Sequence, residues 1–333
     1  MQISIFSRCA SGISAAALLA ACGGSQPPIG APGAMPQTSA ISMRAAIVSA
    51  PASIPQTLTT TAQQHAPTAQ LLYVTNGGDY NEVKVYDARG NDTNPIKVLS
   101  SDLETPFGDC FDSEGTLYVV NEPAGPGWVT EFPAGKTKPS KIITKGIDTP
   151  AFCAIDSKGN LWVTNIAYAN ATEYEPGSTK PHAVITKGMI YPVGIAFDHA
   201  GNMYVSNRLS EYSGNIEVYP PGSKSPKRTI TNGVTSPVGI TVDAKGTLYV
   251  VNIIESDVEE YRFGKSQPFQ AITEELNGPQ AATVSKDGYL YVTNTGGNNV
   301  LEFAPGSIKP LDRKISKGLW DAEAAAYSPP LLP

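Results

Sequence analysis

Leu72-Tyr73-Val74-Thr75-Asn76 is the first of six copies of a short run that is rich in strand-forming residues and ends in Asn. The other copies begin at Leu117, Leu161, Met203, Leu248 and Leu290. Successive copies start 45, 44, 42, 45 and 42 residues apart. A period of about 40–50 residues made of short strands is typical of a β-propeller, in which each repeat forms one blade. The run therefore predicts one ring of blades and not two separate domains.

A second strand signal precedes the later copies. Five segments begin with Pro and end with Asp or Ser, at residues 106–112, 150–156, 192–198, 237–243 and 279–285. Each is followed by a tight turn that contains Gly, at positions 115, 159, 201, 246 and 288. Asp or Ser favours the start of such a turn, and Gly supplies the positive φ that ends it. These segments are the predicted inner strands of the blades.

Two further strands complete each repeat. The third ends in an aromatic residue, at Tyr86, Phe132, Tyr174, Tyr219, Tyr261 and Phe303. The fourth opens with Pro, at Pro95, Pro139, Pro181, Pro226, Pro268 and Pro310, and Lys is common around it. Pro cannot donate to a strand ladder and Lys discourages edge pairing, so both residues mark an edge strand. We expect the fourth strand to be the outermost one.

The ends of the repeat region predict how the ring closes. The first repeat starts near Leu71 and has no inner strand of its own. Residues 322–328 match an inner strand and have no further repeat after them. The sequence therefore predicts an all-β, six-bladed β-propeller of four-stranded antiparallel blades over residues 69–333. The C-terminal strand is expected to complete the N-terminal blade.

The N-terminal 68 residues are excluded from this fold. Arg8 and the apolar run 13–21 are typical of a signal peptide, and the run is too short to span a bilayer. Leu19-Ala20-Ala21-Cys22 resembles a bacterial lipobox, which implies cleavage after residue 21 and lipid on the sulfur of Cys22. An ordinary signal peptide with a chance Cys is the alternative. Residues 22–68 are rich in Pro, Ala, Ser and Thr and are predicted to be a flexible tether.

The lipobox resemblance also implies a location. The residue after the lipidated Cys is Gly23 and not Asp, which by that resemblance favours the outer membrane of the bacterial cell envelope, facing the periplasm or the exterior. The formal net charge is −6 without a block of like charge, which argues against nucleic acid as a partner. We expect a monomer that is attached to the membrane through its lipid.

Four cysteines occur in the chain. Cys9 would leave with the signal peptide and Cys22 would carry the lipid. Cys110 and Cys153 fall on predicted inner strands of adjacent blades, two and three residues before the strand-ending Asp. In an oxidising compartment they could form a disulfide between blades. The alternative is two buried thiols that pack as small apolar groups.

The repeat pattern over residues 70–328 resembles NHL-repeat propellers and the wider group of SMP-30/gluconolactonase-like proteins. Its Leu-Tyr-Val-Thr-Asn runs also resemble YVTN-type repeats, which usually form seven blades. This resemblance implies the fold and implies no particular activity, because propellers host unrelated functions.

In the gluconolactonase-like enzymes, a divalent cation is held at the mouth of the central channel by oxygen ligands five residues before the strand-ending Asp. The corresponding residues here are Phe107, Ala151, Val193, Val238, Gln280 and Glu323. Only Glu323 is a strong ligand for a hard cation, which needs several oxygens. We therefore expect no metal and no other cofactor. Glu323, Gln280 and Phe107 remain candidates for ligand contact at the mouth, although Glu323 could simply be solvated or paired with a neighbour.

No catalytic residue is assigned from the sequence. His65, His182 and His199 show neither metal-ligand spacing nor the setting of a hydrolytic triad. The Asn that recurs in every copy is interpreted as structural: it would bond the backbone of its own turn, since a residue present in every blade serves the blade.

Loops between the second and third strands carry Tyr80, Trp128, Tyr168 and Tyr212. Aromatic loop residues on a rigid scaffold could stack on sugars or peptides, or could instead cap the blades. The favoured function is a lipid-anchored extracytoplasmic binding module with a protein or glycan partner. The alternatives are a lactonase, esterase or lyase with a divergent site at the channel mouth, and a purely structural envelope component.

Overall fold

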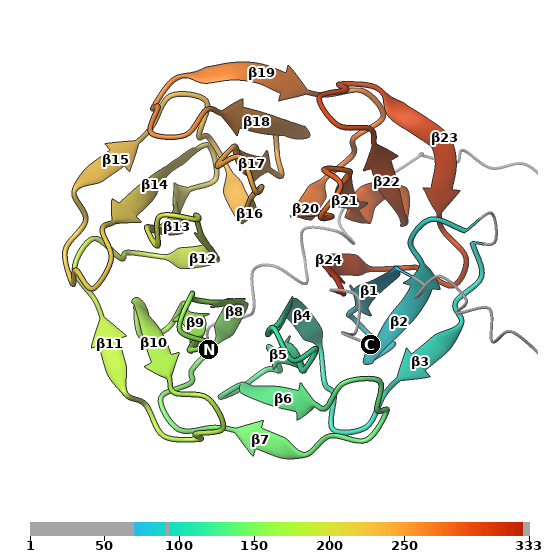
Figure 1. Ribbon diagram of the computed structural model, residues 1–333, viewed down its shortest axis with the longest axis horizontal. Helices are drawn as coiled ribbons and strands as arrows, with labels where there is room; N and C mark the ends of the chain where they lie inside the picture. The colour runs from blue at the N-terminus through green and yellow to red at the C-terminus, as the bar shows by residue number, and fades with distance from the viewer. Residues whose placement is uncertain (1–69, 91–92, 329–333) are drawn as a thin grey trace, which may run out of the picture. The chain divides into compact units, whose positions relative to one another are not determined.

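Residues 70–90 and 93–328 are described by the computed structural model, and they form twenty-four strands and one short 3-10 helix. The strands make six four-stranded antiparallel sheets arranged in a ring (Figure 1). This confirms the predicted fold class. The predicted signal peptide, the lipidation site Cys22 and the tether lie outside the described residues.

Each sheet is one blade, and its strands follow the predicted order from the channel outward. The innermost strands are β4 (Pro106–Phe111), β8 (Pro150–Ile155), β12 (Pro192–Phe197), β16 (Pro237–Val242), β20 (Pro279–Val284) and β24 (Ala322–Tyr327). The second strands are β1 (Leu71–Asn76), β5 (Leu117–Asn121), β9 (Leu161–Asn165), β13 (Met203–Ser210), β17 (Leu248–Asn252) and β21 (Leu290–Asn294). Blades are numbered here by these second strands, so that blade 1 contains β1.

The third strands are β2 (Glu82–Asp87), β6 (Trp128–Phe132), β10 (Asn170–Tyr174), β14 (Ser213–Tyr219), β18 (Asp257–Tyr261) and β22 (Asn299–Phe303). The outermost are β3 (Lys97–Leu99), β7 (Lys141–Ile143), β11 (Ala183–Ile185), β15 (Arg228–Ile230), β19 (Pro268–Ile272) and β23 (Pro310–Ile315). The helix η1 (Thr295–Gly297) follows β21. Pro opens β19 and β23 and stands two residues before the other four outermost strands, which are shorter than the pattern predicts.

The last strand closes the ring. β24 pairs antiparallel with β1, so that Leu72 lies opposite Tyr327 and Asn76 opposite Ala322. Each innermost strand contacts the next one around the channel, and β24 in turn contacts β4 (Figure 1). The prediction that the C-terminal strand completes the N-terminal blade is therefore confirmed.

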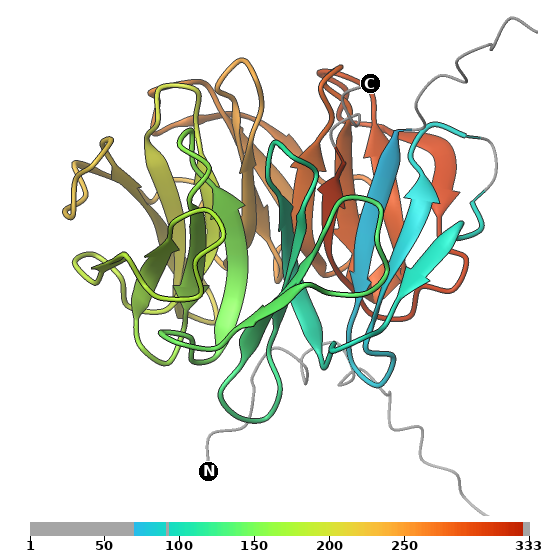
Figure 2. The ribbon, with the colours of Figure 1, turned by 60° about the horizontal axis from the view of Figure 1, so that its bottom comes forward.

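The loops gather at two opposite ends of the blades (Figure 2). We call one end the entry face: it carries the loops that lead into the innermost strands and the loops between second and third strands. The other end, the turn face, carries the tight turns between innermost and second strands. The register fixes this assignment, since Pro106 pairs with Asn121 at the entry face and Phe111 with Leu117 at the turn face.

The recurring Asn is buried in all six blades and has the same contact in each. Its side-chain oxygen accepts a hydrogen bond from the loop that leads into the innermost strand of its own blade. The donors are the backbone N–H groups of Glu104, Asp148, Ile190, Thr235, Asn277 and, in blade 1, both Trp320 and Asp321. The Asn is structural, but this oxygen holds the neighbouring loop and not the turn of the Asn itself.

A hydroxyl group joins neighbouring blades in four places. Thr164 accepts a hydrogen bond from the backbone N–H of Phe152 in its own blade (3.1 Å) and donates to the carbonyl of Val193 in the next (2.6 Å). Thr75, Ser206 and Thr293 make equivalent pairs of contacts. Blades 2 and 5 have Val120 and Val251 at this position. Apolar clusters fill the spaces between the blades.

Candidate functional site

An exposed aromatic pair stands on the entry face of blade 1. The rings of Tyr80, in the loop between β1 and β2, and Trp320, in the loop before β24, are nearly parallel at 11° with centroids 6.3 Å apart. Tyr80 is 47% exposed and Trp320 is 62% exposed. Tyr80 was predicted from the sequence as a loop contact and Trp320 was not. The sequence did contain a signal for Trp320, because an aromatic residue in a loop between blades is a candidate for ligand contact.

Two carboxyl groups lie next to this pair at the start of β24. Burial raises the pKa of Glu323 well above its usual range, and the nearby charges of Asp321 and Glu122 raise it further. Burial also raises the pKa of Asp321, while a hydrogen bond from Glu323 partly offsets that effect. Both shifts favour the protonated carboxyl group, most strongly at Glu323, which is the more deeply buried of the two.

The loop that carries Tyr80 lies directly on these carboxyl groups because it begins with two glycines. A Cβ atom on Gly77 would lie 3.1 Å from Cγ of Glu323, and one on Gly78 would lie 2.9 Å from Oδ2 of Asp321. The φ of Gly78 is +55°, which glycine adopts at low cost. The backbone N–H of Gly77 also donates to the carbonyl oxygen of Asp321 (2.9 Å). The aromatic pair and Asp321 therefore share one surface, with Glu323 buried beneath it, and we call these four residues the blade 1 site.

The residues expected at an open channel mouth are in fact buried. Phe107, Gln280 and Glu323 are 2%, 1% and 4% exposed. Phe107 packs into an apolar cluster with Val193 and Val238, which occupy the same position in other blades. This level of the channel is thus filled with side chains. Of the three residues, Glu323 belongs to the blade 1 site.

The remaining predicted loop aromatics are not part of this site. Nε1 of Trp128 donates hydrogen bonds to Oγ1 of Thr130 (3.1 Å) and to the carbonyl of Asp102 (3.2 Å), so this side chain braces its own blade. Tyr168 and Tyr212 are exposed on the entry face of blades 3 and 4. They extend the aromatic character of that face without joining the Tyr80–Trp320 pair.

A cavity of about 760 Å³ lies at the turn-face end of the channel. Its wall includes Cys110 of β4 and Cys153 of β8, which a disulfide joins between blades 2 and 3, with their Cα atoms 5.8 Å apart. Asp109 also lines the cavity and is 8% exposed. Asp109 was not predicted from the sequence as a site residue. The sequence did contain a signal for Asp109, because it is an acid at a position where the other blades have Cys, Ile or Ala.

Within the described part of the chain, no three His, Cys, Asp or Glu side chains are grouped so that they could hold a metal ion. Nδ1 of His182 lies 3.4 Å from Oε1 of Glu175, and both side chains are exposed. No helix among residues 70–90 and 93–328 has the length and apolar character needed to cross a membrane.

Comparison with known proteins identifies the fold. No family model matches the sequence, and no curated protein matches it. A chain in the crystal structure of a nidogen/laminin complex is 18% identical with a TM-score of 0.66, over 79% of this chain and 99% of that chain. The protein is a six-bladed β-propeller. A protein of unknown function from Bacteroides caccae is 12% identical with a TM-score of 0.61, over 78% of this chain and 99% of that one. At these identities the likeness is one of fold alone.

Proposed function

We propose that the protein is a lipid-anchored, extracytoplasmic binding module that binds a glycan at the blade 1 site. The exposed Tyr80–Trp320 pair carries this proposal. A sugar ring presents apolar C–H faces that pack on flat aromatic rings, and hydroxyl groups that donate to carboxyl oxygens. The blade 1 site offers both kinds of contact side by side, since Asp321 is adjacent to Trp320 in the chain.

Two observations support the location. The lipobox-like segment that ends at Cys22 implies export and lipid attachment. The disulfide between Cys110 and Cys153 fits an oxidising compartment, because structural disulfides are rare in the cytosol of mesophiles. The outer membrane and the likeness to NHL-repeat and SMP-30/gluconolactonase-like propellers remain predictions from sequence.

A protein partner is the main rival to a glycan. The nidogen/laminin structure is a complex between proteins, and one of its chains shares the fold of this protein. A protein interface and a sugar site both use exposed aromatic residues. The carboxyl pair favours the sugar, because acidic residues are depleted at the centre of a protein interface.

A glycan array tests the proposal. The full-length Cys22→Ser variant, which lacks the predicted lipidation site, is applied to an array of bacterial and host glycans. We expect a defined set of glycans to bind, and we expect Trp320→Ala to weaken binding to them at least tenfold in calorimetry. Tyr212→Ala, which removes an equally exposed aromatic from another blade, is the matched control and should bind normally. An array without bound glycan, or binding that Trp320→Ala leaves intact, contradicts the proposal.

The carboxyl pair also favours a second candidate, a hydrolase or lyase of the blade 1 site. Two neighbouring carboxyl groups, of which one strongly favours its protonated form, can act as general acid and general base in one reaction. This activity would be supported if the protein turned over members of a panel of sugar lactones and esters and the Glu323→Gln variant did not. The binding proposal predicts that the same panel is not turned over.

A further inference from the structure

The cavity at the turn-face end of the channel lies at the opposite end of the blades from the blade 1 site and is independent of the function proposed above. Its volume of about 760 Å³ falls within the range of about 300–1,000 Å³ that is usual for small-molecule pockets. The six innermost strands surround it, so its walls are fixed by the closed ring.

The room for this cavity comes from small side chains on one side of the channel. The innermost strand β20 lines it with Ala281 and Ala282, and β24 lines it with Ala324, Ala325 and Ala326. Across the channel, β8 carries Phe152 at the position of Ala281 and Ala324. Nearer the turn face, the cavity is lined by Phe111, Phe197 and Tyr327. The ring of Phe152 therefore faces alanine side chains across the cavity, and further rings line its outer part. Such a space suits a flat, largely apolar molecule that packs against rings.

The inner end of the cavity is closed. The rings of Phe152 and Phe107 meet edge to face, with centroids 5.2 Å apart and planes at 74°. Both are members of the apolar cluster that fills the channel. A molecule in the cavity is consequently separated from the entry face by packed side chains and reaches solvent at the turn face.

The charged side chains of the wall are hydrogen-bonded within their own turns or lie at the exposed rim. Oδ1 of Asp112 accepts hydrogen bonds from the backbone N–H groups of Glu114 and Thr116 in its own turn. Asp156 makes the equivalent contacts, and its Oδ2 also accepts from Trp162. Lys286 lies at the exposed rim, so its ammonium group can stay in water.

Asp109 is the remaining acid in the wall. Neither of its carboxyl oxygens has a hydrogen-bond partner of normal geometry among the described residues. Burial raises the pKa of this carboxyl well above its usual range, although the nearby backbone of Ala326 favours the ionised form. The fold therefore favours the protonated form of Asp109, which adds a hydrogen-bonding group without adding charge. Thr241 and Thr283 contribute half-buried hydroxyl groups to the same wall.

We propose that this cavity is a binding site for an uncharged, mainly apolar small molecule that carries an aromatic ring. The size of the cavity, the rings in its wall and the engagement of the Asp112 and Asp156 carboxylates in their own turns all point to this class. A cationic amine deep in the cavity would need an ionised Asp109, because the carboxylates of Asp112 and Asp156 are held by their own turns. An anionic ligand would need Lys286 to leave the water at the rim.

Fluorescence titration with N-phenyl-1-naphthylamine, a neutral aromatic probe, tests the proposal on the full-length Cys22→Ser chain. We expect saturable binding of one probe per chain. 1-Octanol should displace the probe at concentrations at least tenfold lower than octylammonium or octanoate, which have the same chain length and carry opposite charges. Asp109→Asn keeps the shape and the neutral state, and should change the affinity less than threefold.

Cavity-filling variants locate the probe. Thr283→Trp and Thr241→Trp introduce a large ring from two different walls, and each should weaken binding at least tenfold while the circular dichroism and melting temperature show a folded chain. Thr273→Trp, on an exposed position after β19, is the matched control and should bind normally. Using both wall variants keeps the test decisive if one of them fails to fold. No saturable binding, unchanged affinity in a folded wall variant, or preferential displacement by either charged competitor overturns the proposal.

Discussion

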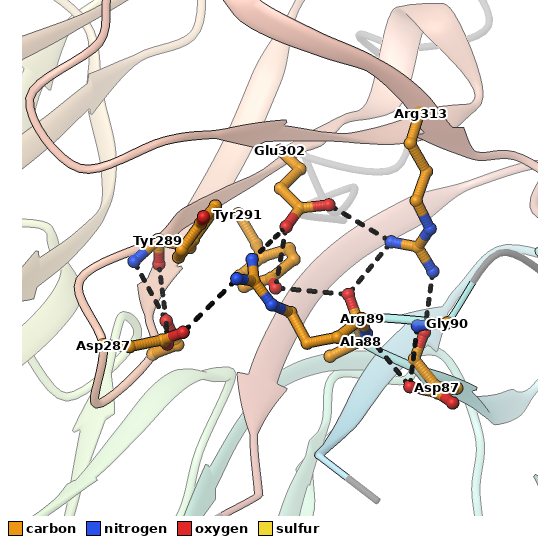
Figure 3. A network of polar contacts seen from close by, with 10 residues as sticks. Asp87, Ala88, Arg89, Gly90, Asp287, Tyr289, Tyr291, Glu302 and Arg313 are labelled. Atoms are coloured by element: carbon orange, nitrogen blue, oxygen red, sulfur yellow. Dashed lines mark hydrogen bonds and ion pairs between the residues drawn. The ribbon is translucent and has the colours of Figure 1, made fainter.

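Arg89 and Glu302 form an ion pair that ties the N-terminal part of the propeller to its last blade. Nη1 of Arg89, just after β2, lies 2.6 Å from Oε1 of Glu302 on β22, across 213 residues of sequence. Arg313 of β23 joins the same carboxylate (3.3 Å) and donates to the backbone carbonyl groups of Asp87 (2.7 Å) and Ala88 (3.0 Å) (Figure 3). One buried carboxylate thus serves two arginines from two blades.

Aromatic residues complete this network. The guanidinium of Arg89 lies 3.3 Å from the ring centroid of Tyr289, a cation–π contact (Figure 3). The hydroxyl of Tyr291 lies 3.2 Å from both the carbonyl oxygen of Ala88 and Oε1 of Glu302. Blade 1 is built from both ends of the chain, so these contacts hold its N-terminal strands in the ring in addition to β24.

Replacing Glu302 by Gln is expected to lower the free energy of unfolding by about 2 kcal/mol. The amide keeps the shape of the side chain but removes the negative charge that both arginines share, and Arg89 keeps its ion pair with the exposed Asp287 (3.3 Å). Urea unfolding at pH 7 measures the loss. Glu275→Gln is the matched control, because its partner Lys314 and Glu275 itself are both more than 40% exposed. That change should cost no more than about 0.5 kcal/mol. Equal effects of the two variants would show that the buried network adds nothing.

Deleting residues 318–333 is expected to abolish cooperative thermal unfolding of the propeller. The deletion removes β24, which supplies the innermost strand of blade 1 and buried apolar groups such as Ala322 and Ala325. Deleting residues 329–333 is the control and leaves all of β24 in place. Differential scanning calorimetry compares the two chains. A normal melting transition in the longer deletion contradicts closure by the C-terminal strand.

The fold could be predicted from the sequence because every blade repeats the same signals. Six Asn-terminated runs, the Pro at each edge and the unmatched strand at each end of the repeat region determine blade number, strand order and closure. These signals are local, and they need only the alternation and turn preferences of each strand.

The blade 1 site was less accessible to prediction. Trp320 and Asp321 belong to the atypical last repeat, and they meet Tyr80 and Gly77 only because the ring closes. The sequence pattern also did not reveal that Glu323 is buried. Its burial depends on how closely adjacent innermost strands approach one another. Glycines such as Gly239 permit this approach, since a Cβ there would lie 2.7 Å from Cα of Ala281. A repeat pattern gives the position of a residue around the ring but not the packing across it.

The hydroxyl group that bonds to two neighbouring blades can be removed from one blade and introduced into another. Thr164→Val should lower the free energy of unfolding by about 1–3 kcal/mol, because it strands the buried N–H of Phe152 and the buried carbonyl of Val193. Val120→Thr at the equivalent position of blade 2 should cost less than that, since a hydroxyl there can make the same two contacts. Denaturant unfolding of both variants decides the matter. A larger loss in Val120→Thr than in Thr164→Val would contradict this role.

Asp109 should make stability fall as pH rises. Its pKa is raised in the folded state, so the folded protein holds this proton more tightly than the unfolded chain does. The benefit is fully present below the unfolded value of about 4 and is lost progressively above it. Asp109→Asn removes this dependence, so its stability relative to the wild type should increase from pH 4 to pH 8, by up to about 1.4 kcal/mol per pH unit. Urea midpoints across that range measure it, with Glu114→Gln on an exposed turn as the control for net charge. A constant difference would mean that Asp109 is ionised in the fold.

The disulfide between Cys110 and Cys153 should stabilise the propeller chiefly through its long loop. It links residues 43 apart, for which the loss of chain entropy in the unfolded state corresponds to about 4 kcal/mol. In a chain with Cys9→Ser and Cys22→Ser, replacing both remaining cysteines by Ala should lower stability by up to that amount. Reductant should lower the parent chain to the same level and leave the double variant unchanged. Denatured parent chain should take up no iodoacetamide before reduction, as judged by intact mass, because both sulfurs are bonded. Uptake of two equivalents would show that the cysteines are free thiols and that the apolar surroundings alone account for their burial.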